Sequence, residues 1–465
     1  MFLKSTMRMN KFLKSAMTEK NPFITTTKVM EWLKERNEAI QVKVTKIPFE
    51  ELNHWFLDKN QGVLKHSSGK FFTIEGINVK TNWGNINEWE QPIINQPEIG
   101  YLGIITKEIN DVLYFLLQAK VEPGNVNNVQ LSPTLQATKS NYTQVHAGAK
   151  PRYLEYFQNA TKNEIILDQL QSEQGARFLR KRNRNIIIKI EDDIDIHEDF
   201  IWLTLGQIKK LIQKDNLVNM DTRTVISGIP FDFSGDLETN LNDFEFGMLQ
   251  SANENINAKF SFDEIIQWIT KLKCTYEILI EPISIFNILN WEVTANDIRH
   301  KENKYFKVIA AKVEISNREV KTWTQPLVEP LQEGIIAFVV KKINGIYHFL
   351  VQAKLECGNF DIIEMAPTVQ CITGSYKEDN RVPYLNYVLG VNKEQIKFDT
   401  LQSEEGGRFY REQNRSMIIE AKDDFSMEIP ENYMWLTLNQ LNYFLKFNNY
   451  LNIQARSLIS AINFI

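Results

Sequence analysis

The segment Leu116–Asn125 reads LLQAKVEPGN, and the segment Leu350–Asn359 reads LVQAKLECGN. Lys120 and Lys354 are 234 residues apart (354 − 120), and the Pro-Thr pair that follows each segment keeps this spacing. In both copies an apolar run ends in polar residues and a glycine, which is typical of a buried strand that delivers polar groups at its end. The chain is therefore organised around one duplicated strand.

Other motifs repeat in the same order. Helical periodicity at Thr27–Leu33 returns at Phe262–Ile269, and each predicted helix leads into a predicted half-buried strand, at Val42–Pro48 and Tyr276–Pro282. Further on, SEQGARF in the first copy corresponds to SEEGGRF in the second. A period this long indicates duplication of a whole domain, because the repeats of solenoid proteins are about 20–50 residues long.

The repeat pattern divides the chain into four parts. Near the end of each repeat, Thr204 and Thr437 are predicted helix caps, each with a glutamine at the third helical position. The four predicted parts are a floppy N-terminal extension (1–20), the first repeat (21–228), a linker rich in Asp, Asn and Gly (229–260) and the second repeat (261–465).

Composition narrows the class of protein. A chain of 465 residues that is 43% hydrophobic can bury two good-sized cores. Its net charge of −5 gives no general attraction to nucleic acid or to an anionic membrane. Three cysteines without paired spacing favour reduced thiols and a cytoplasmic location. No window approaches the length of a membrane span, and the basic N-terminal segment lacks the apolar core of a secretion signal.

Several common sites have no support in the sequence. There is no Gly-x-Gly-x-x-Gly after a predicted strand, no Walker loop and no Gly-x-Ser-x-Gly. The six histidines and three cysteines show no metal-ligand spacing, so we expect no zinc site.

What remains is a duplicated set of Gln, Lys, Glu, Arg, Tyr and Trp side chains around predicted strand ends. Arg177, Arg184 and Lys120 can neutralise phosphates, aromatic rings can stack on a base and amides can bond hydroxyls, which indicates an anionic, sugar-like ligand. The competing interpretation is that the repeated residues only maintain the fold. Glu173 and Arg177, which are four residues apart, would then form a salt bridge on a helix.

His146 breaks the repeat, because the 234-residue offset places Asn380 opposite it. Histidine exchanges protons near neutral pH, so this difference favours unequal halves with the chemistry in the first. The acidic cluster Glu404–Arg408 is a rival in the second half, and His146 as a plain surface-loop residue is the competing interpretation. His348 replaces Tyr114 in an aromatic strand and is predicted to be a packing residue.

With these motifs the chain resembles a known family, the NDP-hexose 2,3-dehydratases of deoxysugar pathways. In the first half the resemblance is carried by QAKVEPGNVN (118–127), QLSPTLQAT (130–138) and SNYTQVH (140–146). In the second half it is carried by SEEGGRFY (403–410) and NIQARSL (452–458). The likeness extends from about Pro22 to the C-terminus.

The resemblance implies an α+β fold, a tandem duplication of two Nudix-like modules that each have a mixed sheet between helices, and a homodimer. The sequence lacks the acidic signature helix of Nudix hydrolases, so metal-dependent diphosphate hydrolysis is not expected. The implied substrate is dTDP-4-keto-6-deoxyglucose, which loses water across C2 and C3. A base removes the acidic C3 hydrogen, an acid assists departure of the C2 hydroxyl, and no redox cofactor is needed.

The implied site residues are assigned as follows. His146, with Glu122 or Glu173, is the predicted acid–base pair, and Lys120 or Tyr142 is predicted to steady the enolate. No metal ligand and no cofactor are expected. The predicted substrate-binding residues are Trp89, Gln118, Gln136, Arg152, Tyr153, Arg177, Arg182, Arg184, Tyr376 and Arg408.

Three other functions remain open at this point. The chain could be another nucleotide-sugar lyase or isomerase on the same scaffold, a non-catalytic nucleotide-sugar binding protein, or a Nudix-type hydrolase. The last would require a divalent metal and release a nucleoside monophosphate.

Overall fold

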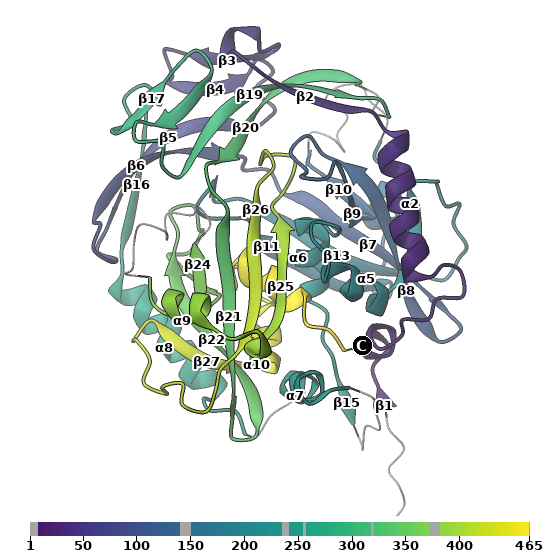
Figure 1. Cartoon of the computed structure of the whole chain (residues 1–465). Coiled ribbons are helices and arrows are strands. Elements are labelled where there is room, and N and C mark those ends of the chain that lie inside the picture. Colours follow the sequence, from purple (N-terminus) through teal and green to yellow (C-terminus); the bar gives the residue numbers. More distant parts are fainter. Residues whose placement is uncertain are drawn as a thin grey trace, which may run out of the picture.

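The computed structural model describes residues 8–139, 150–234, 241–253, 257–317, 320–371 and 382–464. Within these residues, most strands belong to four sheets, and helices pack around the two largest of them (Figure 1). A fifth, two-stranded sheet joins β1 (Arg8–Met9) to β15 (Phe233–Ser234).

The first repeat folds around a seven-stranded mixed sheet. β13 runs parallel to β7, whereas the other neighbours in this sheet pair antiparallel. Ile186, Ile187 and Ile188 are consecutive and all buried, as expected for a strand that is covered on both faces. The strands are β7 (Gly100–Ile109), β8 (Val112–Val121), β9 (Val129–Pro133), β10 (Leu135–Ala137), β11 (Ile165–Ser172), β13 (Arg182–Ile190) and β14 (Phe200–Thr204).

The second repeat forms a sheet with the same pairing. β26 runs parallel to β21, and the two central strands again carry the duplicated segments. Gln118 lies on β8 between β9 and β14, and Gln352 lies on β22 between β23 and β27. The glutamines occupy equivalent strands, which confirms the predicted duplication. The strands are β21 (Gly334–Ile343), β22 (Ile346–Leu355), β23 (Ile363–Ala366), β24 (Val369–Cys371), β25 (Ile396–Ser403), β26 (Gln413–Glu420) and β27 (Tyr433–Thr437).

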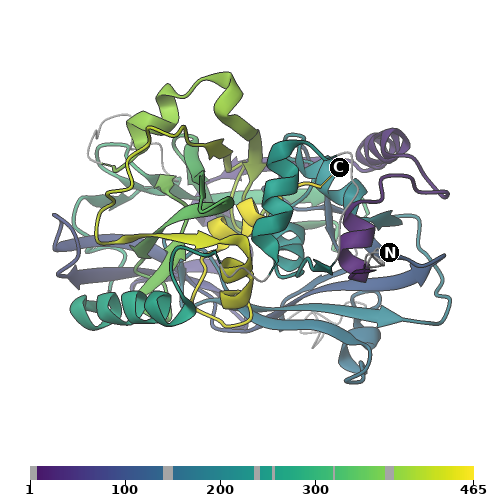
Figure 2. The ribbon, with the colours of Figure 1, turned by 90° about the horizontal axis from the view of Figure 1, so that it is seen from below.

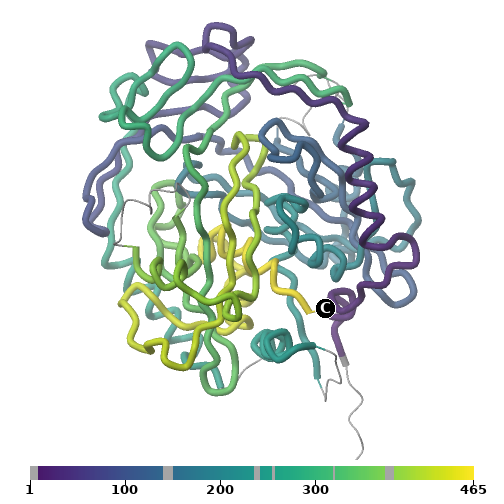
Figure 3. The backbone as a smooth tube through the Cα atoms, viewed as in Figure 1, coloured from purple at the N-terminus to yellow at the C-terminus, as the bar shows by residue number. Residues whose placement is uncertain are grey.

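Two smaller sheets join the repeats, because each takes one strand from the other half. β2 (Val42–Ile47) of the first repeat pairs with β19 of the second, and β16 (Ile278–Ile283) of the second pairs with β5 of the first. In Figure 3 the purple segment after α2 runs along the molecule to reach the green strands at the top. The two repeats are thus intertwined.

β2 and β16 lie where the sequence predicts half-buried strands. The sequence does not reveal that each of them pairs with a strand of the other repeat. The six-stranded sheet contains β3 (Trp55–Asp58), β4 (Val63–His66), β5 (Thr73–Thr81), β6 (Glu88–Asn95), β12 (Phe178–Leu179) and β16. The five-stranded sheet contains β2, β17 (Trp291–Val293), β18 (Asp297–His300), β19 (Phe306–Ile315) and β20 (Thr322–Pro330).

The helices begin at the predicted caps. Thr204 and Thr437 each form a capping box with the glutamine three residues later. Ser261 does the same with Glu264 at the start of α8 (Phe262–Thr275). The helices are α1 (Lys11–Ala16), α2 (Thr26–Ala39), α4 (Leu154–Gln158), α5 (Leu205–Ile212), α6 (Met220–Ser227), α7 (Asp243–Ala252), α8 (Phe262–Thr275), α9 (Leu385–Gly390), α10 (Leu438–Phe444) and α11 (Ile453–Ser460).

Three sequence predictions need correction. The N-terminal extension is not floppy from residue 8 onward, because α1 buries Leu13 and its Ser15 hydroxyl donates to the Leu113 carbonyl at 2.6 Å. α1 lies near the C-terminal end of the chain (Figure 2). The linker contains α7, which buries Met248 and Leu249. The segment from Glu173 to Arg177 is a loop between strands and not a helix.

Candidate active site

Two polar clusters form where the strand end of one repeat meets a loop of the other. The first centre contains residues of both repeats, namely Lys120, Glu122, Ser132, Gln136, Asn219, Asp221, Glu405 and Arg408. The second centre contains the equivalent positions, namely Lys354, Glu356, Ala366, Gln370, Asn452, Gln454, Gln174 and Arg177.

Glycine is needed where the repeats cross. A Cβ atom on Gly124 would lie 1.7 Å from the backbone oxygen of Phe409, and one on Gly358 would lie 1.8 Å from that of Phe178. The Gly124 N–H donates to the Gly406 carbonyl at 2.7 Å, and the equivalent bond links Gly358 to Gly175 at 2.7 Å. The glycine of each duplicated segment therefore lets a loop of the opposite repeat approach its strand end.

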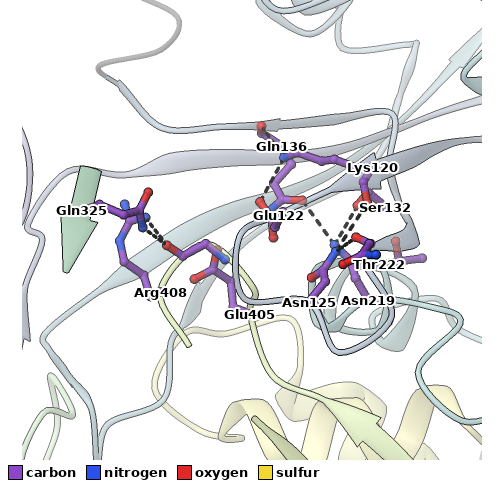
Figure 4. A network of polar contacts seen from close by, with 12 residues as sticks. Lys120, Glu122, Asn125, Ser132, Gln136, Asn219, Thr222, Gln325, Glu405 and Arg408 are labelled. Atoms are coloured by element: carbon purple, nitrogen blue, oxygen red, sulfur yellow. Dashed lines mark hydrogen bonds and ion pairs between the residues drawn. The ribbon is translucent and has the colours of Figure 1, made fainter. Parts of the chain in front are cut away.

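A chain of hydrogen bonds organises the first-repeat side of the first centre (Figure 4). The Lys120 ammonium lies 3.4 Å from a Glu122 oxygen, and Gln136 Nε2 donates to the same oxygen at 2.9 Å. Asn219, the cap of α6, donates from Nδ2 to Gln136 Oε1 at 3.2 Å and to Ser132 Oγ at 2.8 Å. The Glu122 carboxylate is thus held between a cation and an oriented amide.

The loop between β25 and β26 supplies the second-repeat side. Glu405 accepts the Gly407 N–H at 2.9 Å. The Arg408 guanidinium stacks 4.2 Å from the centre of the Phe72 ring, and its Nε donates to Gln96 Oε1 at 3.2 Å. Both contacts fix the guanidinium beside the carboxylates without neutralising its charge.

Electrostatic interactions show that the acidic groups of the first centre are close neighbours. Burial, followed by the negative charge of Glu122, raises the pKa of Glu405 to about 7. Burial also raises the pKa of Asp221 well above its usual range, and Glu405, Glu173 and Glu122 add to this effect. Crowded carboxyl groups cannot all ionise, so this centre holds a proton near neutral pH, as an acid–base site requires.

The second centre keeps the scaffold but differs at two of the acidic positions. Gln370 Nε2 donates to Glu356 at 2.9 Å, and Asn452 Nδ2 donates to Gln370 at 2.7 Å, as in the first centre. However, Gln174 stands where the first centre has Glu405, and Gln454 stands where it has Asp221. Of these three positions the second centre therefore retains one carboxyl group, whereas its other nearby carboxyl groups, Glu364 beside Glu356 and Glu412 beside Arg177, stand at other positions.

The two centres also differ in access to solvent. Gln136, Glu405 and Arg408 of the first centre are each partly exposed. Their counterparts Gln370, Gln174 and Arg177 are only 5%, 1% and 4% exposed. A reactant can therefore approach the first centre more readily than the second.

The structure brings together four of the predicted site residues, namely Lys120, Glu122, Gln136 and Arg408. It places others beside the second centre. Arg177 stacks 4.0 Å from the Phe306 ring and interacts with Glu356, and Arg182 stacks 3.8 Å from Phe360. Trp89 donates to Gln91, which contacts the Ala176 carbonyl in the loop of that centre.

Other predicted residues have structural partners elsewhere. Arg184 forms two bonds with Asp168, at 2.7 and 2.6 Å, and the equivalent Arg415–Asp399 pair does the same. The Tyr153 hydroxyl donates to the Asp195 carbonyl at 2.8 Å. Arg152 is exposed beside Tyr153, and Gln118 lies on β8.

Glu173 does not form the predicted salt bridge with Arg177. Its carboxylate accepts from Asn183 Nδ2 at 2.6 Å, and its counterpart Glu404 accepts from Asn414 at 2.7 Å. Glu173 also adds negative charge near Glu405 and Asp221, so it lies close to the first centre. His348, in contrast, is fully buried and accepts the Lys259 N–H at 3.0 Å, which agrees with the predicted packing role.

Tyr142, His146 and Tyr376 lie outside the described residues. The sequence interpretation did not assign Asn219 and Asp221 to the site. Duplication could have identified Asn219, which returns as Asn452, whereas Asp221 differs from its counterpart Gln454. The sequence indicated Glu405 only as part of the rival acidic cluster, because no local sequence pattern shows that it lies beside Glu122.

Two negative findings concern the part of the chain that the structure describes. In it, no group of three or more His, Cys, Asp or Glu side chains is arranged to hold a metal ion. Nor is any helix among those residues long and apolar enough to cross a membrane.

A separate cavity of about 750 Å³ lies beside α7 and the C-terminal segment. Two of its charged groups are already paired, because Glu420 accepts from the Tyr347 hydroxyl and lies 2.8 Å from the Lys397 ammonium. None of the duplicated polar segments contributes to it. The first centre is therefore the better candidate for chemistry.

Comparison with known proteins finds relatives over almost the whole chain. A profile of the NDP-hexose 2,3-dehydratase family matches residues 26–229 and again 262–462. The chain is similar to proteins named dTDP-4-dehydro-6-deoxy-alpha-D-glucopyranose 2,3-dehydratase. The one from Saccharopolyspora spinosa is 43% identical and the alignment covers 97% of this chain and 94% of that protein. The one from Amycolatopsis orientalis is 40% identical, with 97% and 92% covered. A third, from Streptomyces violaceoruber, is 39% identical, with 93% and 95% covered.

Proposed function

The chain belongs to the NDP-hexose 2,3-dehydratase family, and from this we propose that it is a lyase acting on dTDP-4-keto-6-deoxyglucose. The reaction removes water across C2 and C3 and yields the 3,4-diketo-2,6-dideoxy sugar. The observation that carries the proposal is the first centre, where Glu122 and Glu405 share one site with the Lys120 ammonium. Dehydration beside a ketone needs such a set, which is a base, an acid and a cation for the oxyanion.

We assign the base role to Glu122. Its carboxylate lies 3.4 Å from the Lys120 ammonium and accepts from Gln136 Nε2, and these two contacts orient it within the first centre. The adjacent C4 carbonyl acidifies the C3 hydrogen of the substrate. Transfer of this proton to Glu122 leaves an enolate across C3 and C4, and the Lys120 ammonium stabilises the negative oxygen.

We assign the acid role to Glu405. A carboxyl group with a pKa raised to about 7, chiefly by burial, keeps its proton in a large fraction of molecules at neutral pH. Its proton goes to the C2 hydroxyl, the C2–O bond breaks, and water leaves as the enolate electrons form the C2–C3 double bond. The resulting enol becomes a ketone at C3 and takes up a proton at C2.

Substrate binding is assigned to the cationic and amide groups around this pair. Arg408 supplies positive charge for the diphosphate, and Gln136 can bond sugar hydroxyls. Tyr142 and His146 remain candidates for the enolate and proton-transfer roles, since they follow Gln136 by six and ten residues along the chain. His146 would serve as an alternative proton carrier to Glu405.

The two centres are proposed to be unequal, with turnover in the first. The second centre has Gln174 and Gln454 at the positions of Glu405 and Asp221. A neutral amide cannot act as a general acid or a general base near neutral pH. Its Gln174 and Arg177 side chains are also almost fully buried. Chemistry in the first centre uses residues of both repeats, so the first half alone is not the catalytic unit.

We also propose that each repeat is a Nudix-like module, that two chains form a homodimer and that the enzyme is cytoplasmic. The Nudix-like module is supported by the mixed sheet of each repeat. Among the described strands, the parallel pair is β7 with β13 in the first repeat and β21 with β26 in the second. Free cysteines at 274, 357 and 371 fit a reducing compartment. Light scattering of the purified chain tests the dimer, and a monomer mass at micromolar concentration would contradict it.

The function is tested by incubating the purified protein with dTDP-4-keto-6-deoxyglucose, with and without EDTA, and following the nucleotide sugar by mass spectrometry. We expect loss of one water without added nicotinamide, flavin or metal. Release of dTMP would instead indicate hydrolysis of the diphosphate, and binding without any mass change would indicate a non-catalytic nucleotide-sugar protein. Strict dependence on an added redox cofactor would also contradict the proposal.

A further inference from the structure

Arg223 is a fully buried side chain that connects the two repeats next to the first centre. It lies on α6 and is 1% exposed. Its Nη2 donates to the Ser403 carbonyl at 2.6 Å, and its Nη1 donates to Gln402 Oε1 at 2.7 Å. Its Nε donates to Ser457 Oγ at 2.8 Å. One guanidinium of the first repeat thus holds three groups of the second.

The groups that Arg223 holds lie directly before the acidic loop. Ser403 ends β25, and Glu404 and Glu405 follow it. The Ser403 hydroxyl makes a second link to the first repeat, because it donates to Gln130 Oε1 at 2.9 Å. The Glu405 position relative to Glu122 is therefore set from the first repeat, through the backbone of Ser403.

Arg456 performs the equivalent task for the second centre. It is also 1% exposed, donates from Nη2 to the Ser172 carbonyl and donates from Nε to Thr224 Oγ1 at 2.8 Å. Ser172 precedes the loop that carries Gln174. The two arginines are thus matched in burial and place in the fold. The loop after Ser403 brings Glu405 to Glu122, whereas the loop after Ser172 has Gln174 at the equivalent position, and its Glu173 carboxylate is bonded to Asn183.

We propose that Arg223 is a positioning residue for the dehydration, which holds the Glu405 loop of the second repeat against the Glu122 strand end of the first. The proposal rests on the proposed function of the first centre. Arg223 does not act on the substrate; it acts through Ser403. A planar guanidinium with five donors in a fixed fork can hold these partners at once, whereas an ammonium presents a single point charge.

The decisive experiment compares Arg223→Lys with Arg456→Lys in the full-length protein. Both variants keep a basic side chain and lose the fork at equally buried positions, so a purely structural role predicts equal loss of melting temperature and equal loss of activity. We expect Arg223→Lys to lower kcat about 10- to 100-fold with little change in KM, the usual effect of misplacing a catalytic group. Arg456→Lys is expected to keep nearly wild-type kcat despite a similar loss of melting temperature.

The pH profile gives a second readout. The charged groups that interact with Glu405 are Glu122, Glu173, Asp221, Arg408 and Lys181. A loop that moves away from Glu122 removes part of the negative field on Glu405 and admits water. The alkaline limb of the kcat profile is therefore expected to move to lower pH in Arg223→Lys and to stay in place in Arg456→Lys.

A milder matched pair covers the case in which the lysine variants do not fold. Ser457→Ala removes one acceptor from Arg223, and Thr224→Ala removes one from Arg456. We expect the lower kcat and shifted profile only in Ser457→Ala. Equal kinetic effects within either pair overturn the proposal. Failure of the proposed function would look different, because the wild-type protein itself would then not dehydrate the substrate.

Discussion

The carboxyl group of Glu122, in the first repeat, interacts electrostatically with that of Glu405, in the second. Burial and this interaction together raise the pKa of Glu405 to about 7. Two groups that lie 283 residues apart (405 − 122) thus form one candidate acid–base pair. Because the loop that carries Glu405 crosses from the other repeat, neither repeat supplies the pair by itself.

The pH dependence of turnover follows from the raised pKa of Glu405. As the general acid, Glu405 must be protonated, so kcat is expected to fall as pH rises through about 7. This fall of kcat with rising pH should be absent from the residual activity of Glu405→Gln, because an amide does not titrate in this range. Steady-state assays across neutral pH check this. A kcat that rises through the same range in the wild-type protein would reverse the assigned roles.

The close approach of the two repeats at Gly124 predicts that one added methyl group lowers the stability of the protein strongly. Gly124→Ala places a Cβ 1.7 Å from the Phe409 backbone oxygen, which belongs to the main chain and cannot rotate away. We expect the free energy of unfolding to fall by at least about 1–3 kcal/mol, the scale for overpacking. Gly390→Ala is the control, because a Cβ there meets nothing within 4 Å. Similar melting temperatures for the two variants would contradict the close approach.

How far the sequence predicts this architecture depends on the range of the interaction. Local patterns place α2, β2, α8 and β16 correctly, because periodicity and caps reflect each segment's own surroundings. They do not reveal that β2 and β16 pair with strands of the other repeat, since the alternation would be the same in either sheet. A capping box at Asn242 and Glu245 could have identified α7 inside the presumed linker.

The same limit applies to the site. Duplication identifies Lys120, Glu122 and Gln136, but it presents Glu405 as part of a competing site in the second half. The structure places Glu405 beside Glu122, so the two rival clusters are one centre. The four-residue spacing of Glu173 and Arg177 left a helical salt bridge open as an alternative to a site role. That salt bridge does not form, because the segment is a loop and the two side chains have different partners.

Buried Glu412 predicts a pH dependence of stability. It is 2% exposed, and burial raises its pKa from 4.5 to about 7. Between these values the folded state keeps a proton that the unfolded state has released, so the stabilising contribution of this group is lost as pH rises. We expect the melting temperature to fall less steeply over this range in Glu412→Gln than in the wild-type protein. Identical slopes in thermal unfolding would contradict the raised pKa.

The asymmetry at His146 remains a prediction from the sequence. If its imidazole transfers the proton, His146→Asn should lower turnover by about 100-fold or more, with substrate binding little changed. The control is Asn380→His, which restores histidine at the equivalent position of the second repeat and should leave turnover unchanged. Wild-type turnover in His146→Asn would leave proton transfer to Glu122 and Glu405.

The central claim is that water loss takes place in the first centre, with Glu122 as its base. Glu122→Gln and Glu356→Gln change equivalent buried carboxylates, each bonded to an equivalent glutamine at 2.9 Å. The most direct measurement is the single-turnover rate of water loss from dTDP-4-keto-6-deoxyglucose in these two variants. We predict a loss of about 100-fold or more in Glu122→Gln and a nearly wild-type rate in Glu356→Gln. An unchanged rate in Glu122→Gln, together with a lost one in Glu356→Gln, would place the reaction in the second centre and contradict the account.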